Sequence, residues 1–124
     1  MNIQKLIQAK GVFAPLIRQK LSPKLSYKLL KFIRSIEAEE EFYNSKLREI
    51  INEYCKKDDE GKFVIENGEV VFIEDTESEG RKSIEELNNT EVESPNISFT
   101  LDELQDVALS VVDIAKIEDF IKEE

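Results

Sequence analysis

At 124 residues, with 40% hydrophobic and 35% charged side chains, the chain has the size of one domain and the composition of a soluble, helix-rich protein. It contains no histidine, which removes the commonest general base and metal ligand and excludes Ser–His and Cys–His nucleophile pairs within one chain. No apolar run approaches the roughly 20 residues of a membrane span, and the single cysteine, Cys55, allows no intramolecular disulfide, so we expect a cytoplasmic protein.

The net charge of −10 is divided very unevenly along the chain. Residues 1–36 hold eight Lys or Arg side chains and no Asp or Glu, whereas residues 37–124 hold nine basic and 27 acidic side chains. The two parts therefore carry +8 and −18, which creates two separate electrostatic fields on one molecule. We expect the basic part to dock on an acidic region of the same chain or of a second copy; the alternative is a surface for nucleic acid, a nucleotide or another polyanion. The candidate residues for this basic surface are Arg18, Lys20, Lys24, Lys28, Lys31 and Arg34.

Residues 2–20 have the pattern of a basic amphipathic helix with an interruption. Asn2 is a suitable N-cap, and the apolar side chains recur on one side of the helix. Gly11 weakens the helix and Pro15 removes a backbone hydrogen bond from its interior. We therefore expect a kink or two short helices that fold back on the next element.

The longest predicted element is one uninterrupted helix from Ser22 to Tyr54, ending near Cys55 and about 50 Å long. Ser22 and Pro23 form a typical start, because a hydroxyl caps the free N–H groups and the proline ring holds a helical φ. Apolar side chains recur at steps of three and four, interrupted by the acidic stretch 37–41. The rest of the chain is too short and polar to cover so long a stripe, so we predict that another polypeptide covers it. The interface candidates are Leu25, Leu29, Phe32, Ile36, Tyr43, Leu47, Ile50 and Tyr54.

Residues 62–74 have the pattern of a β-hairpin. Asn67-Gly68 separates two runs of β-branched and aromatic residues and supplies the two positive-φ positions of a tight turn. An isolated hairpin is marginally stable in water, so this one must pack on a helix or pair with another strand. Residues 96–100 are the candidate third strand.

The remaining elements are shorter. Residues 75–89 predict a weak helix with only Ile84 and Leu87 as apolar anchors. Residues 101–122 predict C-terminal helices, because Thr100 with Glu103 and Ser110 with Asp113 each have the spacing of a capping box. The predicted fold is therefore a single α+β domain over residues 1–124, dominated by one long central helix beside a small antiparallel hairpin or three-stranded sheet.

Carboxylates are the remaining candidates for catalysis. Glu37, Glu40 and Glu41 are spaced to share a helix face, as in helical hydrolases that hold Mg²⁺ through converging oxygens. A second acidic helix face that would close such a site is missing from the pattern, and the four glycines form no phosphate-binding loop. We therefore predict no catalytic residue, no metal and no cofactor.

Three stretches of the chain resemble a known family: LSPKLSYKLLKFIRSIEAEEEFYNSKLREIINEYCKKDDEGKF, SIEELNNTEVE and LSVVDIAKIEDFIKEE. Their order is similar to that in small phage and prophage proteins of Gram-positive bacteria classified as a domain of unknown function. The likeness covers residues 16–124 and consists of helix starts, turns and apolar spacing. It implies an origin in a phage genome and expression in the bacterial cytosol, and it carries no catalytic assignment.

These observations predict a non-enzymatic interaction protein. The expected partners are a second copy, as a dimer or higher oligomer through the long helix, and a host or phage protein, with inhibition of a host defence as one such role. One alternative is an acidic mimic of nucleic acid that occupies a basic enzyme channel. Another is binding of nucleic acid or a nucleotide through the basic N-terminal end. A membrane partner is not expected.

Overall fold

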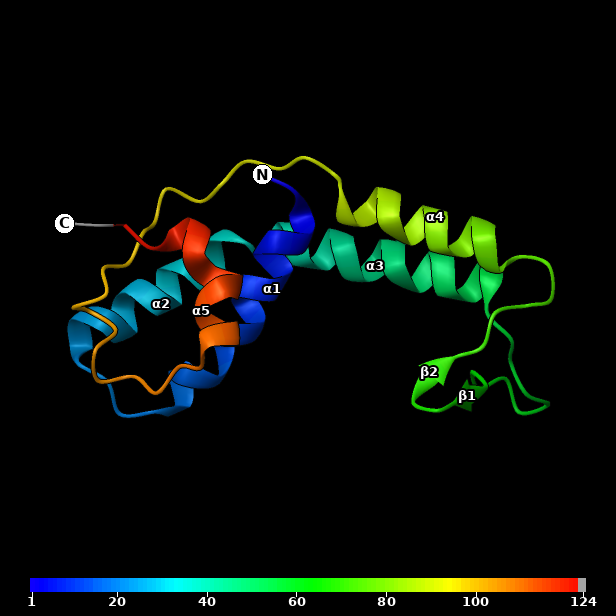
Figure 1. The fold of residues 1–124 in the computed structure, drawn as a ribbon, viewed down its shortest axis with the longest axis horizontal. Helices are drawn as coiled ribbons and strands as arrows, with labels where there is room; N and C mark the ends of the chain where they lie inside the picture. Colours follow the sequence, from blue (N-terminus) through cyan, green and yellow to red (C-terminus); the bar gives the residue numbers. More distant parts are fainter. Residues whose placement is uncertain (123–124) are drawn as a thin grey trace.

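The computed structural model describes residues 1–122 and has two parts, a head and a slender arm (Figure 1). The head consists of residues 1–36 and 97–122, and the arm of residues 37–89, in which α3 and α4 lie side by side and lead to the hairpin. The predicted α+β, helix-dominated fold is confirmed. The elements in chain order are α1 (Ile3–Phe13), the 3₁₀ helix η1 (Ala14–Arg18), α2 (Pro23–Ser35), α3 (Glu37–Tyr54), β1 (Ile65–Glu66), β2 (Glu69–Val70), α4 (Glu77–Asn88), α5 (Val111–Ile117) and the 3₁₀ helix η2 (Glu118–Phe120).

The N-terminal segment bends back at the predicted place. Asn2 caps α1, since its side-chain oxygen accepts a hydrogen bond from the Lys5 backbone N–H at 3.1 Å. The α-helix ends at Phe13 and continues as η1, which begins at Ala14 with Pro15 in its first turn. A proline is tolerated there because no intrahelical N–H is needed at that position.

The predicted single helix from Ser22 is divided in two at Ile36, which corrects the expectation of an uninterrupted rod. Ile36 ends α2 and begins α3, with φ −109° and ψ 6°, outside the helical region. The Ser35 hydroxyl donates to the Phe32 carbonyl at 2.6 Å, a local bond that competes with the helical ladder and favours a bend. The start at Ser22 is as predicted, because its Oγ accepts from the Leu25 N–H at 3.2 Å.

The head is built around four phenylalanine rings from four separate segments. Phe32 of α2 contacts Phe13 of α1 and Phe120 of η2, each at a ring-centroid distance of 4.9 Å. Phe99 lies 4.8 Å from Phe13, in a tilted arrangement. The two contacts of Phe32 are edge-to-face, a geometry that adds to the free energy gained by removing the rings from water. The four rings therefore tie the N-terminal helices to the C-terminal segment.

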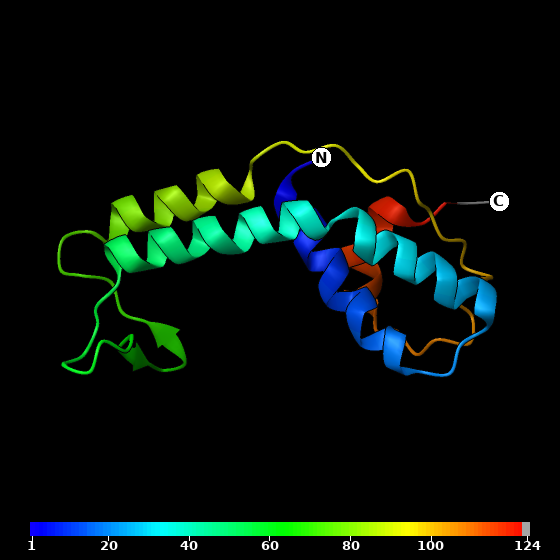
Figure 2. The ribbon, with the colours of Figure 1, turned by 180° about the vertical axis from the view of Figure 1, so that it is seen from behind.

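The first half of the apolar stripe lies in this core. Leu25, Leu29, Phe32 and Ile36 are exposed by 5%, 0%, 0% and 1%, so the chain's own segments cover them completely. This corrects the expectation that these four side chains face another polypeptide. The bend at Ile36 explains the difference, since it lets α2 fold into the head while α3 extends away from it (Figure 2).

Part of the basic N-terminal end docks on acidic side chains of the same chain. Lys5 pairs with Asp119 at 3.0 Å, and Lys10 pairs with Glu40 across the junction of head and arm. The N-terminal ammonium of Met1 lies 3.0 Å from Glu91. These ion pairs hold acidic residues from later in the chain against the N-terminal segment. They agree with the expectation that the basic part docks on an acidic region of the same chain.

The hairpin turn forms where Asn67-Gly68 predicts it, with φ 51° and 79° at these two residues. Ile65 pairs with Val70 in the antiparallel ladder, but a third strand from residues 96–100 is not seen within residues 1–122. Phe99 instead forms a single parallel bridge with Ile121 in the head. Its ring belongs to the phenylalanine cluster, so the segment that carries it is held in the head, away from the hairpin.

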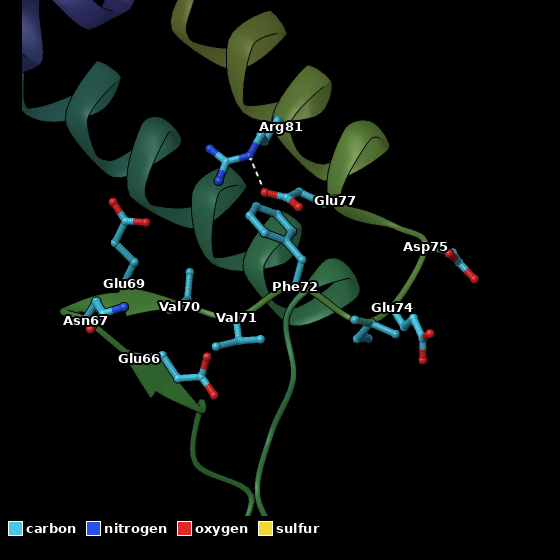
Figure 3. Close-up of a pocket in the computed structure, with 11 residues that line it drawn as sticks. Glu66, Asn67, Glu69, Val70, Val71, Phe72, Glu74, Asp75, Glu77 and Arg81 are labelled. Carbon is cyan, nitrogen blue, oxygen red and sulfur yellow. Dashed lines mark hydrogen bonds and ion pairs between the residues drawn. The ribbon is translucent and has the colours of Figure 1, made fainter.

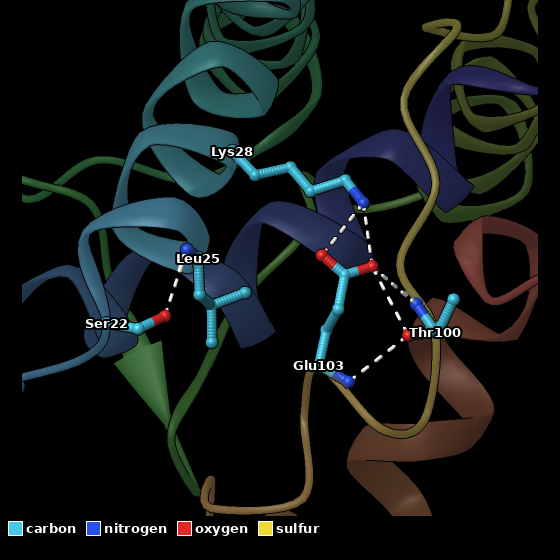
Figure 4. A network of polar contacts seen from close by, with 5 residues as sticks. All are labelled: Ser22, Leu25, Lys28, Thr100 and Glu103. Atoms are coloured by element: carbon cyan, nitrogen blue, oxygen red, sulfur yellow. Dashed lines mark hydrogen bonds and ion pairs between the residues drawn. The ribbon is translucent and has the colours of Figure 1, made fainter.

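The predicted C-terminal helices are shorter than residues 101–122. The capping box of Ser110 and Asp113 is present and opens α5. The Thr100–Glu103 box also forms, but it closes a turn instead of a helix (Figure 4). Lys28 of α2 donates to both carboxylate oxygens of Glu103, at 2.8 and 3.0 Å, and thereby ties this turn to the head.

This network predicts a pH dependence of stability. The hydrogen bond from Lys28 lowers the pKa of Glu103, so the carboxylate stabilises the folded state above the ordinary Glu pKa of about 4.3, and this contribution is lost as pH falls through the lower folded value. Glu103→Gln should therefore cost about 1.5 kcal/mol at pH 7, and the cost should shrink below pH about 4. Urea unfolding of the wild type and of Glu103→Gln at pH 7 and pH 3 measures the cost of the substitution at each pH.

Glu93→Gln is the matched control, because Glu93 is exposed and forms no ion pair among the described residues. Its free energy of unfolding should differ little from that of the wild type at either pH. A Glu103→Gln cost that is equal at pH 7 and pH 3 would show that the charge on Glu103 contributes nothing.

Candidate interaction site

The acidic stretch at the start of α3 does not gather its carboxylates into a cluster of three or more potential metal ligands. Within residues 1–122, no group of three or more His, Cys, Asp or Glu side chains is placed to hold a metal ion. Glu40 is engaged by Lys10, while Glu37 and Glu41 are exposed. In the same part of the chain, no helix combines the length and the apolar character that crossing a bilayer requires.

The arm is held together by one seam between α3 and α4. None of the 18 residues of α3 is fully buried. On the seam, the Tyr43 hydroxyl donates to the Asn88 side-chain oxygen at 2.7 Å. The second half of the predicted interface, Tyr43, Leu47, Ile50 and Tyr54, is only partly buried. Phe42, beside this stripe, is 44% exposed.

Backbone hydrogen bonds fasten the hairpin to the end of α3 and to the residues that follow it. Residues 54–57 pair with both hairpin strands: the Lys56 N–H donates to the Val71 carbonyl at 2.7 Å, and the Val64 N–H donates to the Lys56 carbonyl at 3.0 Å. Cys55 and Phe72 face each other in an antiparallel bridge. Burial raises the pKa of the Cys55 thiol, so the arrangement favours an inert side chain over a reactive one. We call residues 54–77 the tip of the arm.

A cleft of about 470 Å³ opens between the hairpin and the first turns of α4 (Figure 3). Its lining combines apolar and acidic side chains. Arg81 is the single cation that lines it, and this guanidinium is already engaged, 2.9 Å from Glu77 and over the Phe72 ring at 5.2 Å. The apolar lining residues are Val70, Val71, Phe72 and Ile73, and the acidic ones are Glu66, Glu69, Glu74, Asp75 and Glu77.

The position of Phe72 depends on a glycine in α4. A Cβ atom on Gly80 would lie 2.6 Å from Phe72 Cε1 and 3.0 Å from Tyr54 Cβ. Only a residue without a side chain lets the ring lie against the helix, which is why a helix interior tolerates glycine here despite its low helix propensity. The contact therefore packs the segment after β2 closely against α4.

The arm carries most of the charge of the protein. Residues 37–89 hold 17 acidic and seven basic side chains, a net charge of −10. The cleft therefore lies at the end of a rod whose field attracts cations and cationic segments. At the other end, the head presents the basic surface. Lys28 of this surface is paired with Glu103 and is partly buried. The other candidate residues of the basic surface are exposed: Arg18, Lys20, Lys24, Lys31 and Arg34.

The cleft is the feature that sequence reasoning did not find. The signals for it are Val70 and Phe72 on alternating strand positions and Gly80 in an otherwise polar helix. These residues produce a cleft only because the hairpin lies against α4. Residue spacing does not encode this tertiary contact. The predicted interface residues, by contrast, are divided by the fold between the head core and the arm seam.

Comparisons with known proteins add no relative. No family model matches the chain, and neither the curated proteins nor the solved structures contain a significant match. The resemblance to phage and prophage proteins therefore stays a prediction.

The Gly80 contact gives a direct test of the tip. Gly80→Ala should lower the free energy of unfolding by about 1–2 kcal/mol, since displacing the Phe72 ring costs more than the gain of about 1 kcal/mol in helix propensity. It should also accelerate labelling of the buried Cys55 thiol. Urea unfolding and thiol labelling of the native protein measure the two effects.

Gly11→Ala is the control, because a Cβ atom at Gly11 in α1 meets nothing within 4 Å. That variant should gain about 0.5–1 kcal/mol and leave the labelling rate unchanged. If both substitutions stabilise the protein, the close contact between Phe72 and Gly80 does not exist in solution.

Proposed function

We propose that this protein is a non-enzymatic interaction protein that binds another protein through its arm. The supporting observation is the surface area of the chain. It exposes 8771 Å², whereas a compact monomer of its mass exposes about 6,800 Å². The excess of about 2,000 Å² is more than the roughly 800 Å² that each partner buries in a standard protein–protein interface. The thin, poorly buried arm therefore supports a role in which the protein works through its exposed surface.

The charge of the arm indicates the chemistry of the partner. With a net charge of −10 over residues 37–89 and a cleft lined by both acidic and apolar side chains, the arm suits a basic protein surface that offers an apolar side chain with neighbouring Lys or Arg. The charges set the rate and the specificity of encounter, and burial of the apolar side chain against Phe72 supplies affinity.

Self-association is the second part of the proposal. The partly buried side chains of α3, together with the exposed Phe42, leave an apolar edge on the arm that a second copy would cover. The first half of the original stripe does not contribute, because it lies inside the head. A dimer through α3 would leave the cleft at the tip of each arm accessible.

The resemblance to phage and prophage proteins supports a more specific role. A phage-encoded acidic protein would meet host proteins in the bacterial cytosol, and a host defence protein with a basic surface is a suitable partner. The alternative form of this proposal is mimicry, in which the carboxylates of the rod imitate a nucleic-acid backbone and occupy a basic enzyme channel. The segregation of the net negative charge on the arm supports that alternative.

Affinity capture from phage-infected host lysate tests the proposal when two charge-matched variants are compared. Glu66→Gln/Glu69→Gln/Glu74→Gln removes three exposed carboxylates from the cleft lining. We expect this variant to retain the specifically captured protein about tenfold less well, as the loss of three charge contacts implies. Quantitative mass spectrometry of the eluates measures the ratio.

The control, Asp102→Asn/Asp106→Asn/Glu118→Gln, makes the same change in net charge on exposed positions of the head. It should capture the same protein at the wild-type level. Equal losses in both variants would mean that overall charge alone governs binding, and a loss in the control only would move the partner site from the arm to the head.

A further inference from the structure

The outer side of α2 carries a second surface that the proposed function does not use. Leu25, Leu29 and Phe32 face the core at steps of three and four. The residues at the complementary steps share the opposite side of the helix and point to solvent. We call this set the α2 outer face; it consists of Lys24, Tyr27, Lys31 and Arg34, with Lys20 just before the helix.

Tyr27 is an unusual component of this face. It is 63% exposed although it is a large aromatic residue, and it lies among cations. Lys31 Nζ is 5.6 Å from the centre of its ring, so one cation already rests on the aromatic face. A hollow of about 260 Å³ lies between α2 and residues 96–98; its lining includes Lys28, Lys31 and the polar Asn96 and Ser98.

The cations of this face are free to bind an external anion. Residues 1–36 contain no Asp or Glu, so the helix itself supplies no competing carboxylate. The nearby carboxylate of Glu103 is occupied by Lys28 through both oxygens. Among residues 1–122, no ion pair involves Lys20, Lys24, Lys31 or Arg34. Four cations on one exposed face therefore form a site for a polyanion.

We infer that the α2 outer face binds single-stranded nucleic acid, with the Lys and Arg side chains on phosphates and the Tyr27 ring stacked on a base. This combination of a cationic track and an exposed aromatic ring is what sequence-tolerant single-strand binders use. An acidic protein would satisfy the cations but leave the ring bare. A membrane would require a broad apolar face, whereas the exposed aliphatic side chain on this helix, Leu30, is a single residue.

The net charge of −10 does not prevent this binding, because the charges are far apart on the scale of electrostatic screening. The Debye length is about 8 Å at physiological salt. Lys24 lies about 18 Å along α2 from the junction at Ile36, at 1.5 Å per residue. Beyond the junction, the arm leads away from α2 (Figure 2). A strand bound at the Lys24 end of the outer face is therefore largely screened from the acidic arm.

Fluorescence anisotropy of a labelled 20-nucleotide single strand, titrated with the full chain at salt concentrations from 50 to 200 mM, tests the inference. We expect binding with a logarithmic salt slope of about −3, as four to five phosphate contacts predict. Lys24→Glu/Lys31→Glu should reduce binding at least about tenfold and flatten the slope. Tyr27→Ala should weaken binding at least about fivefold and leave the slope unchanged, whereas Tyr27→Phe should retain wild-type affinity.

The matched control is Lys116→Glu/Lys122→Glu, which makes the same charge change at exposed positions of the head. It should bind the strand as the wild type does, and circular dichroism should show that all variants are folded.

Three results would each overturn the inference: no binding at 50 mM salt, equal losses in the control, or displacement of the strand by polyglutamate together with an unchanged affinity of Tyr27→Ala. Light scattering that shows a dimer broken by Lys24→Glu/Lys31→Glu would assign the face to the acidic arm of a second copy instead. The three overturning results leave partner capture by the arm unaffected, so the two proposals fail separately.

Discussion

Burial of Ile36 at the junction of α2 and α3 is the interaction on which the architecture depends. An apolar stripe that spans the 30 residues from Leu25 to Tyr54 cannot be covered by one small core, so the chain has to divide it. The bend places Leu29, Phe32 and Ile36 within the phenylalanine cluster of the head, each with at most 1% of its surface exposed. Everything beyond Ile36 leaves the head as an arm whose support is the seam with α4 and the pairing of the hairpin at its end.

The same division separates the charges. Within the head, Lys5 and Lys28 are neutralised by carboxylates of the C-terminal segment, and Lys10 reaches across to the arm. These contacts use a part of the basic N-terminal end and leave the outside of α2 cationic. The arm keeps a net charge of −10. The molecule therefore presents two surfaces of opposite sign at its two ends, which lets each surface select its own class of partner.

Local rules predicted local structure well in this chain. Asn2 and Ser22 cap the helices that they were expected to start, and Asn67-Gly68 forms the hairpin turn, because these signals act within four residues. The break at Ile36 escaped prediction, because the interruption of the apolar stripe at residues 37–41 was interpreted as an acidic stretch within one helix. The burial of Ile36 in the head, which accompanies the local Ser35–Phe32 bond, is a tertiary contact that spacing does not show. The third strand was misplaced for a similar reason: β-propensity marks Phe99 as strand-forming but does not say which partner it pairs with. The cleft at the tip depends on the same kind of long-range contact.

Native-state hydrogen exchange tests the division into head and arm most directly. The account predicts that backbone amides of α1 and α2 exchange only by global unfolding, whereas amides of α3 beyond Ile36 and of α4 exchange by a smaller opening with a lower free energy. The reason is that α3 contributes no fully buried side chain. Equal protection of the two groups of amides in the isolated chain would contradict the account, because it would show that the arm is part of one cooperative core.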